Sequence, residues 1–255
     1  MDKNAIITGA TAGIGEATAK ILAENGWNIA ITGRRKDRLE KLALYISGKH
    51  AVEVIPLCFD VRDKIACEKA AAKLKDRWDE LHLLVNNAGL AASYETIDND
   101  SPENWDRMID TNIKGLLYVT HCFLPQIKKC RGHVINIGST AGKEVYEKGN
   151  VYCATKFAVD ALSKAMRIDM LPHGVKVTAV CPGAAETEFS LVRFDGNAQK
   201  ASDVYRDFTP LTAHDIAEVI LFCATRPPNV NINDVVLTST DQASSIYINR
   251  RNKEN

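Results

Sequence analysis

Two patterns of hydrophobic positions alternate along the chain. Short runs rich in β-branched and apolar residues predict strands covered on both faces, because such strands are apolar at successive positions. These runs lie at residues 5–8, 28–32, 52–57, 81–85, 133–137, 175–180 and 235–237. Segments with helical spacing of apolar residues lie between them, at 13–25, 35–47, 62–78, 104–129, 150–172 and 213–225. The alternation predicts βαβ units and therefore an α/β fold, a doubly wound parallel sheet of about seven strands with helices on both faces.

One segment and one tail depart from this rhythm. No internal repeat or linker marks a domain boundary, so residues 1–255 are expected to form a single domain. Residues 184–211 form a connection longer than usual, and long ordered connections are often binding loops or lids. We therefore expect this segment to face the substrate. The polar tail, 249–255, is expected to be frayed or to contact another subunit.

Charge and composition exclude several classes of function. The chain has 255 residues, with 32 Lys plus Arg and 32 Asp plus Glu, so its formal net charge is zero. Overall charge therefore gives no basis for binding nucleic acid or an acidic membrane. The longest apolar stretches, such as 115–124, fall short of the ~20 residues that a membrane span needs, and no signal peptide precedes the first strand. A cytoplasmic protein is expected.

Cysteine and histidine positions predict neither disulfides nor a metal site. The seven cysteines are scattered, with no C-x-x-C pair, and most have apolar neighbours. Buried, reduced thiols in a reducing compartment are therefore expected. The six histidines are equally dispersed, so no metal-ligand cluster is predicted.

A glycine-rich turn joins the first predicted strand to the first predicted helix. It reads TGATAGIG over residues 8–15, with G-x-x-x-G-x-G spacing. Gly9 permits a tight turn, Gly13 lets the backbone approach a pyrophosphate, and Gly15 allows close packing of the helix. The amides and dipole of the helix N-terminus then face the phosphates. A glycine-rich turn without a ligand is the alternative, but the position at the first βα turn favours a Rossmann-type dinucleotide site.

The end of the second predicted strand indicates which dinucleotide binds. An acidic residue there would bind the ribose 2′-hydroxyl of NAD, whereas this chain has Arg34 and Arg35. Two arginines match the 2′-phosphate of NADP. The first acidic residue after the strand is Asp37, in the next predicted helix. NADP is therefore favoured over NAD, the alternative being that both arginines only cap a solvated helix.

Three further residues have the types and spacing of a catalytic group. Tyr152 and Lys156 stand at i and i+4 in a helical pattern and so share one face. Ser139 follows the strand at 133–137 in a Gly-Ser-Thr-Ala-Gly loop. Each is unremarkable alone, since a Tyr–Lys pair at this spacing is usually on the surface. Their combination with the glycine turn, the run 86–89 (NNAG) and Asn112 is highly specific.

With these motifs the chain resembles the short-chain dehydrogenase/reductase family over nearly its whole length. It is most similar to the NADP-dependent branch that oxidises 3-hydroxy acids such as serine, allo-threonine and 3-hydroxypropionate. The segments that carry this likeness are 8–15, 33–35, 108–112, 136–142, 149–152 and 187–194. The resemblance implies an enzyme that interconverts a hydroxyl and a carbonyl by hydride transfer with NADP(H).

The resemblance also implies a role for each catalytic candidate. Tyr152 would be the general acid/base, and Ser139 would donate a hydrogen bond to the substrate oxygen. Lys156 would bind the nicotinamide ribose, and Asn112 would hold a water that links Lys156 to solvent. A free tyrosine titrates near ~10, so work at pH 7 requires about 4 kcal/mol. An ammonium ~4 Å away supplies a similar energy at an effective dielectric constant of about 20.

A larger set of residues is implied to bind the cofactor. These are Gly9, Thr11, Gly13, Ile14, Gly15, Arg34, Arg35, Asp60, Val61, Asn87, Ala88, Gly89, Tyr152, Lys156, Pro182, Gly183 and Thr187. Asp60 and Val61 match the family position near the adenine, and Thr187 the one near the carboxamide or pyrophosphate. Asn87 matches a position beside the adenosine ribose, with a purely structural role in the sheet as the alternative.

A hydroxy acid needs a cation for its carboxylate, and an arginine with two parallel donors suits it best. The residues expected to line the substrate pocket are Tyr146, Glu147 and Arg193. Arg193 is the candidate cation, with Lys143 and Lys148 as weaker ones. The alternative is that Arg193 pairs with Glu188 or Asp195 on the surface.

The apolar helices give an expectation about assembly, and the motifs are compatible with three functional hypotheses. The segments 115–124 and 150–170 are apolar on more than one face, which favours a homodimer or homotetramer, as in the family. A broad carbonyl or 3-oxoacyl reductase on the same scaffold is the second enzyme hypothesis. A non-catalytic NADP(H)-sensing protein is the third, and it is disfavoured because such proteins tend to lose the catalytic residues that remain here.

Overall fold

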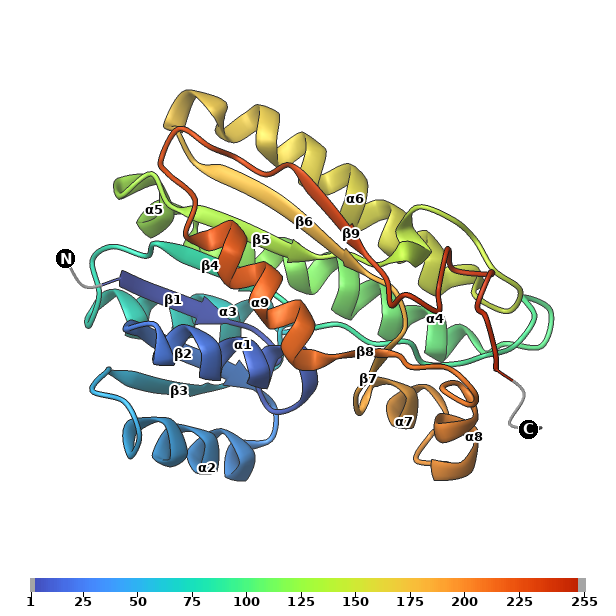
Figure 1. The fold of residues 1–255 in the computed structure, drawn as a ribbon. Coiled ribbons are helices and arrows are strands. Elements are labelled where there is room, and N and C mark those ends of the chain that lie inside the picture. The colour runs from blue at the N-terminus through green and yellow to red at the C-terminus, as the bar shows by residue number, and fades with distance from the viewer. Residues whose placement is uncertain (1–2, 252–255) are drawn as a thin grey trace.

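The computed structural model describes residues 3–251 and contains a seven-stranded sheet with helices on both faces (Figure 1). The strand order is β3-β2-β1-β4-β5-β6-β9, and every neighbouring pair is parallel. The strands are β1 (Lys3–Ile7), β2 (Trp27–Gly33), β3 (Val54–Cys58), β4 (Leu83–Asn86), β5 (His133–Ile137), β6 (Lys176–Pro182) and β9 (Asp234–Leu237). All seven predicted strands lie in this sheet, so the predicted doubly wound Rossmann-type fold is confirmed.

Two layers of helices cover the sheet. The helices are α1 (Gly13–Glu24), α2 (Lys36–Ser47), α3 (Lys64–Lys75), α4 (Pro102–Ile109), α5 (Leu116–Lys129), α6 (Asn150–Met170), α7 (Phe189–Arg193), α8 (Ala198–Asp203) and α9 (Ala213–Ala224). In Figure 1, α1, α2 and α9 cover one face, and α3, α5 and α6 the other. Along β1, Ala5 and Ile7 pack into the first layer and Ile6 into the second. This alternation explains why the strands are apolar at successive positions.

The segment predicted as one helix at 104–129 is helical throughout, from 102 to 129, but it contains a turn of another kind that the sequence did not indicate. A π-helical turn, Asp110–Gly115, separates α4 from α5 and buries Asn112. The Asn112 Oδ1 accepts a hydrogen bond from the Leu90 amide at 2.9 Å, and its Nδ2 donates to the Leu90 carbonyl at 2.8 Å. Such a turn inserts an extra residue without disturbing the apolar spacing on either side, so the hydrophobic pattern does not show it.

Residues 184–211 form a segment outside the main sheet, and the two ends of this segment pair with each other. The strand β7 (Ala185–Glu186) pairs in parallel with β8 (Leu211–Thr212), and α7 and α8 lie between them (Figure 1). The hydroxyl of the half-buried Tyr205 donates to the Ala185 carbonyl at 2.8 Å. The segment is therefore an ordered unit beside the carboxyl ends of the strands.

The described part of the tail is held against the body of the protein. The Asn249 amide donates to the Asp241 carbonyl at 2.7 Å, and Arg250 Nη2 donates to the Val204 carbonyl at 3.1 Å. Residues 249–251 are thus not frayed. The remainder of the predicted tail, 252–255, lies outside the described residues.

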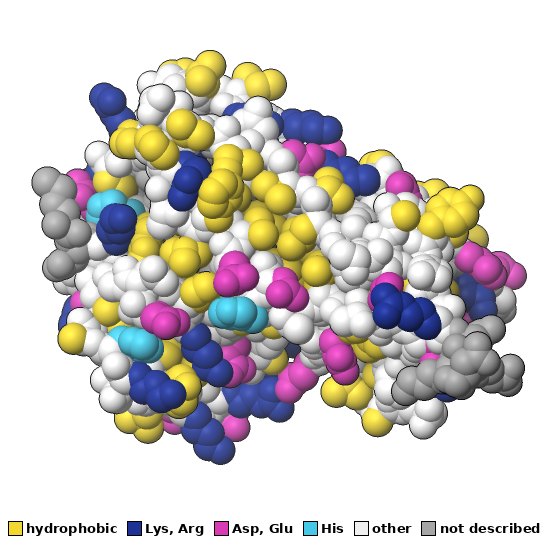
Figure 2. Space-filling view, viewed as in Figure 1, with side chains coloured by type: hydrophobic (Ala, Val, Ile, Leu, Met, Phe, Trp, Pro, Cys, Tyr) yellow, Lys and Arg dark blue, Asp and Glu magenta, His cyan; other side chains and the backbone are white. Residues whose placement is uncertain are grey.

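The surface agrees with a net charge of zero. On the face shown in Figure 2, basic and acidic side chains are interspersed, and neither sign covers a continuous area. Between residues 3 and 251, no helix has the length and apolar character needed to cross a membrane. All seven cysteines are free thiols, of which Cys58 is exposed.

Candidate active site

One cleft of about 1040 Å³ brings the predicted residues together at the carboxyl ends of the strands. Apart from the weaker cation candidates Lys143 and Lys148, it is lined by every residue assigned above to the cofactor, the substrate or catalysis except Gly15 and Asn112. These two contact lining residues, Gly9 and Leu90 respectively. A crevice at this edge is where open α/β sheets bind their ligands.

The glycine turn has the backbone that the sequence predicts. Gly9 and Gly13 have φ values of +68° and +54°, in the left-handed region that favours glycine. A Cβ on Gly13 would lie 3.2 Å from the Thr187 Cβ, so any side chain would fill the space between the turn and the segment after β6. A Cβ on Gly15 would lie 2.5 Å from the Gly9 carbonyl oxygen, which confirms the close approach expected there. The first turn of α1 follows Ala12, which provides no side-chain cap.

The two arginines after β2 lie beside this turn, and both contact other side chains. Arg34 Nη1 is 3.8 Å from the Asp60 carboxylate, which also accepts from Arg62 Nη2 at 2.7 Å. Partial burial of Asp60 acts to raise its pKa, but the hydrogen bonds from Arg62 outweigh it and lower the pKa. Arg35 Nη2 donates to the Thr11 hydroxyl at 2.8 Å, so Arg35 lies against the glycine turn.

Two polar residues connect the turn to the catalytic end of the cleft. The Asn87 Nδ2 donates to the carbonyls of Thr8 at 2.8 Å and Gly9 at 3.3 Å, which supports the structural alternative for Asn87. A Cβ on Gly89 would lie 3.2 Å from the Asn112 Oδ1 and 3.7 Å from the Lys156 Nζ. Asn112 and Lys156 therefore both border Gly89.

The catalytic candidates come from the end of β5 and the start of α6. Ser139 follows β5, and its Oγ accepts from the Ala141 amide at 3.1 Å. Tyr152 lies in the first turn of α6 and is 8% exposed. Lys156 lies one turn later, with its Nζ donating to the Ile137 carbonyl at 2.9 Å and 5.9 Å from the centre of the Tyr152 ring. All three side chains line the cleft.

The spacing of Tyr152 and Lys156 in the sequence suggested that the lysine lowers the tyrosine pKa, whereas in the structure the pKa of Tyr152 is raised. Burial raises the pKa of Tyr152 well above its usual value, and Tyr146 adds to the rise. Arg193 and a hydrogen bond with Ser139 oppose it. Burial also lowers the pKa of Lys156 to about 8. Burial therefore keeps Tyr152 protonated at neutral pH in the chain by itself, and the Lys156 Nζ donates to the Ile137 carbonyl of β5.

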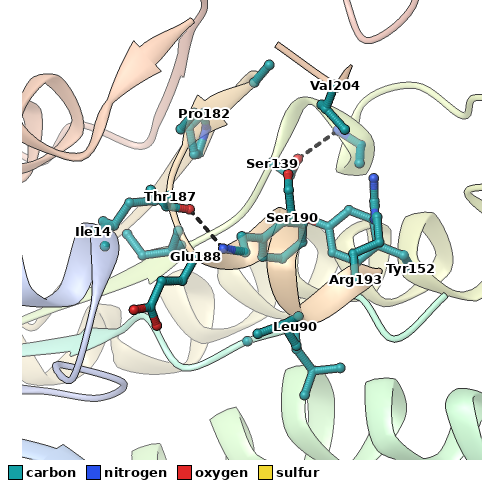
Figure 3. A pocket seen from close by; sticks show the side chains of 18 of the residues that line it. Ile14, Leu90, Ser139, Tyr152, Pro182, Thr187, Glu188, Ser190, Arg193 and Val204 are labelled. Atoms are coloured by element: carbon teal, nitrogen blue, oxygen red, sulfur yellow. Dashed lines mark hydrogen bonds between the residues drawn. The ribbon is translucent and has the colours of Figure 1, made fainter. Parts of the chain in front are cut away.

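Arg193, the last residue of α7, is enclosed by four aromatic rings. Its guanidinium carbon is 5.1 Å from the ring centre of Tyr152, 5.4 Å from Phe189, and 5.7 Å from both Tyr94 and Tyr146. Figure 3 shows Arg193 beside Tyr152. The Arg193 Nη2 donates to the Tyr146 hydroxyl at 2.5 Å, and its buried Nε has no hydrogen-bond partner among residues 3–251. Aromatic faces stabilise a guanidinium without neutralising it.

The surface ion pair considered above for Arg193 is absent from the described structure. Glu188 instead accepts from Arg35 at 2.9 Å and from Arg38 at 2.6 Å. No ion pair within residues 3–251 includes either Arg193 or Asp195. Arg193 therefore presents an unneutralised positive charge to the cleft.

The two weaker cation candidates do not reach the cleft. Lys143 pairs with Asp160 at 2.6 Å and with Asp234 at 2.5 Å. The Lys148 ammonium lies 5.8 Å from the centre of the Tyr94 ring, and neither lysine lines the cleft. The prediction that they could serve as substrate cations is therefore wrong for this structure.

Sequence reasoning missed several residues of the site. Tyr94 and Phe189 supply two of the rings around Arg193, and Gln242 accepts from the Ala184 amide at 2.8 Å. A Cβ on Gly183 would lie 2.2 Å from the Gln242 Oε1, which explains the glycine. Phe189 lies in the segment already assigned to the substrate, so its aromatic side chain was an available signal. Tyr94 and Gln242 lie in irregular segments and had none.

The match to a family model decides the family. Residues 3–197 match the model described as short chain dehydrogenase, a range that includes the glycine turn, Ser139, Tyr152 and Lys156. This chain belongs to the short-chain dehydrogenase family. Members of this family are oxidoreductases, so the chain belongs to a family of enzymes.

Several relatives of this short-chain dehydrogenase match almost end to end. It is 44% identical to the NADP-dependent 3-hydroxy acid dehydrogenase of Salmonella typhi over 240 residues, 93% of this chain and 95% of the relative. It is 41% identical to the serine 3-dehydrogenase of Agrobacterium fabrum and 42% identical to sulfoacetaldehyde reductase 2 of Chromohalobacter salexigens. Both matches cover 95% of this chain and 96% of the relative.

Solved structures agree with the fold of this short-chain dehydrogenase. The closed form of a serine dehydrogenase complexed with NADP⁺ superposes with a TM-score of 0.89 at 40% identity, covering 95% of this chain and 97% of that one. The serine dehydrogenase from Escherichia coli superposes with a TM-score of 0.79 at 36% identity, covering 94% and 99%.

Proposed function

We propose that this chain is an NADP(H)-dependent oxidoreductase that interconverts a hydroxyl and a carbonyl on a small 3-hydroxy acid of the serine, allo-threonine or 3-hydroxypropionate type. The observation that carries this proposal is Arg193, a cation with no carboxylate partner in the described part of the chain, 5.1 Å from the ring centre of Tyr152. The names of the two dehydrogenase relatives support the same substrate class.

The cofactor end of the cleft fits a dinucleotide with a 2′-phosphate. The uncapped first turn of α1 offers backbone amides, and Gly13 leaves the space beside Thr187 that a side chain would fill. Arg34 and Arg35 supply guanidiniums for the 2′-phosphate. When bound, the cofactor supplies the hydride acceptor or donor of the reaction.

The chain supplies proton transfer through Tyr152. Its raised pKa keeps the phenol protonated, which suits delivery of a proton to the oxygen of a carbonyl substrate. Alcohol oxidation requires the phenolate, and Arg193 and Ser139 both act to lower the pKa. The Ser139 Oγ accepts from the Ala141 amide, so its own O–H can be donated either to the Tyr152 oxygen or to the substrate oxygen. Asn112 and Lys156, which border Gly89 together, would complete the path for the proton to solvent.

Substrate selection rests on the aromatic enclosure of Arg193. Tyr94, Tyr146 and Phe189 restrict the volume beside the cation and exclude water from it, which strengthens its attraction for an anion. A carboxylate held by Arg193 places a short substrate chain beside Tyr152. A long acyl chain has no comparable need for a cation here, so a broad 3-oxoacyl reductase is disfavoured. Glu147 also lines the cleft, and its negative charge acts against the binding of an anion.

A sulfonate is the second candidate for the anionic group. One relative is named sulfoacetaldehyde reductase 2, and a guanidinium in an aromatic enclosure binds a sulfonate through the same donors as a carboxylate.

A substrate panel tests these alternatives. NADP⁺ reduction is measured with serine, allo-threonine, 3-hydroxypropionate and 3-hydroxybutyrate, with NAD⁺ as the control cofactor, and NADPH oxidation is measured with sulfoacetaldehyde. We expect NADP⁺-dependent oxidation of the short 3-hydroxy acids. Activity with sulfoacetaldehyde alone would move the assignment to the sulfonate. A kcat/KM that grows with acyl chain length would favour the 3-oxoacyl reductase, and activity with NAD⁺ alone would contradict the roles of Arg34 and Arg35.

We also propose that the chain assembles as a homodimer or homotetramer. Phe157 and Ile168 on α6 and Leu117 on α5 are large apolar side chains exposed to solvent. A second copy that packs on these helices would remove this apolar surface from water. Sedimentation at micromolar concentration should give a dimer or tetramer, and a monomer would contradict the proposal.

A further inference from the structure

Glu188 lies at the start of α7, and its carboxylate faces α2 instead of the substrate pocket. One oxygen accepts from Arg35 Nη1 at 2.9 Å and the other from Arg38 Nη1 at 2.6 Å. Figure 3 shows Glu188 pointing away from Tyr152 and Arg193. Hydrogen bonds therefore link the proposed substrate-binding segment, residues 184–211, to the arginines that follow β2.

Arg35 has protein acceptors on both sides. Its Nε and Nη2 donate to the Thr11 Oγ1 at 3.1 and 2.8 Å, and its Nη1 donates to Glu188. A guanidinium binds a phosphate best through two parallel donors. Three of the five N–H groups of Arg35 already serve Thr11 or Glu188, so a phosphate that binds Arg35 finds two donors left and lies close to the Glu188 carboxylate.

We propose that Glu188 is a cofactor-specificity residue, which competes with the 2′-phosphate of NADP for Arg35 and is retained by Arg38 when Arg35 turns to the phosphate. A phosphomonoester brings about −1.5 to −2 charges next to the carboxylate. Without Arg38, the Glu188 carboxylate would have Arg35 as its remaining hydrogen-bond partner and would compete for it directly with the phosphate. The competition affects NADP and leaves NAD unaffected, because NAD carries an uncharged hydroxyl at that position. This inference rests on the proposed function, since it requires Arg35 to bind the 2′-phosphate.

The test compares the dissociation constants of NADPH and NADH by fluorescence titration at low ionic strength. The variant Glu188→Gln keeps the shape of the side chain and removes its charge. Glu186→Gln is the matched control, because Glu186 is an exposed carboxylate of the same segment that forms no ion pair within residues 3–251. Glu188→Gln should bind NADPH about two- to fivefold more tightly, as expected for an exposed ion pair, with NADH unchanged. Glu186→Gln should change neither constant.

Arg38→Gln provides an independent measurement. It leaves Glu188 to Arg35 alone, so NADPH should bind more weakly, and this loss should disappear in the Glu188→Gln/Arg38→Gln double variant. A loss that persists in the double variant would show that Arg38 acts as a general charge, which overturns its assigned role.

Three results of the titration would overturn the competition itself. Equal changes for NADPH and NADH in Glu188→Gln would show that Glu188 only shapes the segment. Unchanged or weaker NADPH binding would exclude competition, and so would a gain that is the same in Glu186→Gln. If the native chain does not bind NADPH more tightly than NADH, the proposed NADP specificity is wrong, and this inference, which depends on it, is wrong as well.

Discussion

Replacing Arg193 with methionine removes the cation that we assign to the substrate carboxylate. Methionine keeps an unbranched apolar side chain against the four surrounding rings. A charge-assisted hydrogen bond contributes about 1.5–3 kcal/mol, and two unit charges ~4 Å apart attract by about 4 kcal/mol at an effective dielectric constant of about 20. We therefore expect Arg193→Met to cost about 2–4 kcal/mol, or about 30- to 1000-fold in kcat/KM for a 3-hydroxy acid.

The surroundings of Arg193 favour a loss of kcat/KM near the upper end of this range. The Arg193 Nε is buried without a partner among the described residues, and no carboxylate there neutralises the guanidinium. The guanidinium is thus partly shielded from water before a substrate binds. Tyr146→Phe is the matched control, because it removes the hydrogen bond to Arg193 and leaves the charge in place.

The assay separates carboxylate binding from support of Tyr152. The kcat/KM of each variant is measured with NADP⁺ for 3-hydroxybutyrate and for its neutral methyl ester. Arg193→Met should lower kcat/KM for the acid much more than for the ester, which loses only the smaller effect of Arg193 on the Tyr152 pKa, while Arg193→Lys should recover part of the activity on the acid. Equal losses for acid and ester would refute the reasoning, because they would show that Arg193 acts through the Tyr152 pKa and not on the carboxylate.

Three further variants test other parts of the account. Lys156→Met should abolish activity yet raise the melting temperature at pH 7, because the depression of the Lys156 pKa from 10.5 to about 8 corresponds to about 3 kcal/mol of lost stability. That cost is present in full below pH 8 and fades as the pH rises towards 10.5, so the gain measured by thermal unfolding should fade likewise. Gly13→Ala should destabilise the chain by about 1–2 kcal/mol, since the φ of Gly13 is +54°. It should also weaken NADPH binding in a fluorescence titration, and unchanged binding would contradict the role of the glycine turn in holding the cofactor. Arg35→Leu should raise KM for NADP⁺ at least about tenfold and leave that for NAD⁺ unchanged, as expected for one lost charge-assisted contact.

The layers of the fold were predictable because they depend on short-range patterns. Strands such as β1, where Ala5, Ile6 and Ile7 are all apolar, can be recognised from the sequence, and the residues that follow the strands meet at one edge of a parallel sheet. That rule is sufficient to bring Ser139 close to the glycine turn. The pair Tyr152 and Lys156 follows from helical spacing alone.

The parts that were not predictable depend on contacts between distant segments. The π-helical turn that buries Asn112 leaves the apolar spacing intact, so the sequence suggested one continuous helix. Whether Arg193 is neutralised depends on where Glu188 finds its partners, and these lie on α2. The direction in which Lys156 points likewise depends on the carbonyl of Ile137. The choice of partner among equally suitable charges is set by tertiary packing.

Measuring turnover and NADPH binding of Tyr152→Phe tests the central claim most directly. The substitution removes only the phenolic oxygen of a buried ring whose packing against Phe189, at 5.5 Å between ring centres, can persist. Loss of a positioned general acid/base lowers rates by about 100- to 10,000-fold. The account predicts a loss of this size in kcat for 3-hydroxy acid oxidation, with the NADPH dissociation constant nearly unchanged. Near-normal turnover in Tyr152→Phe would contradict it.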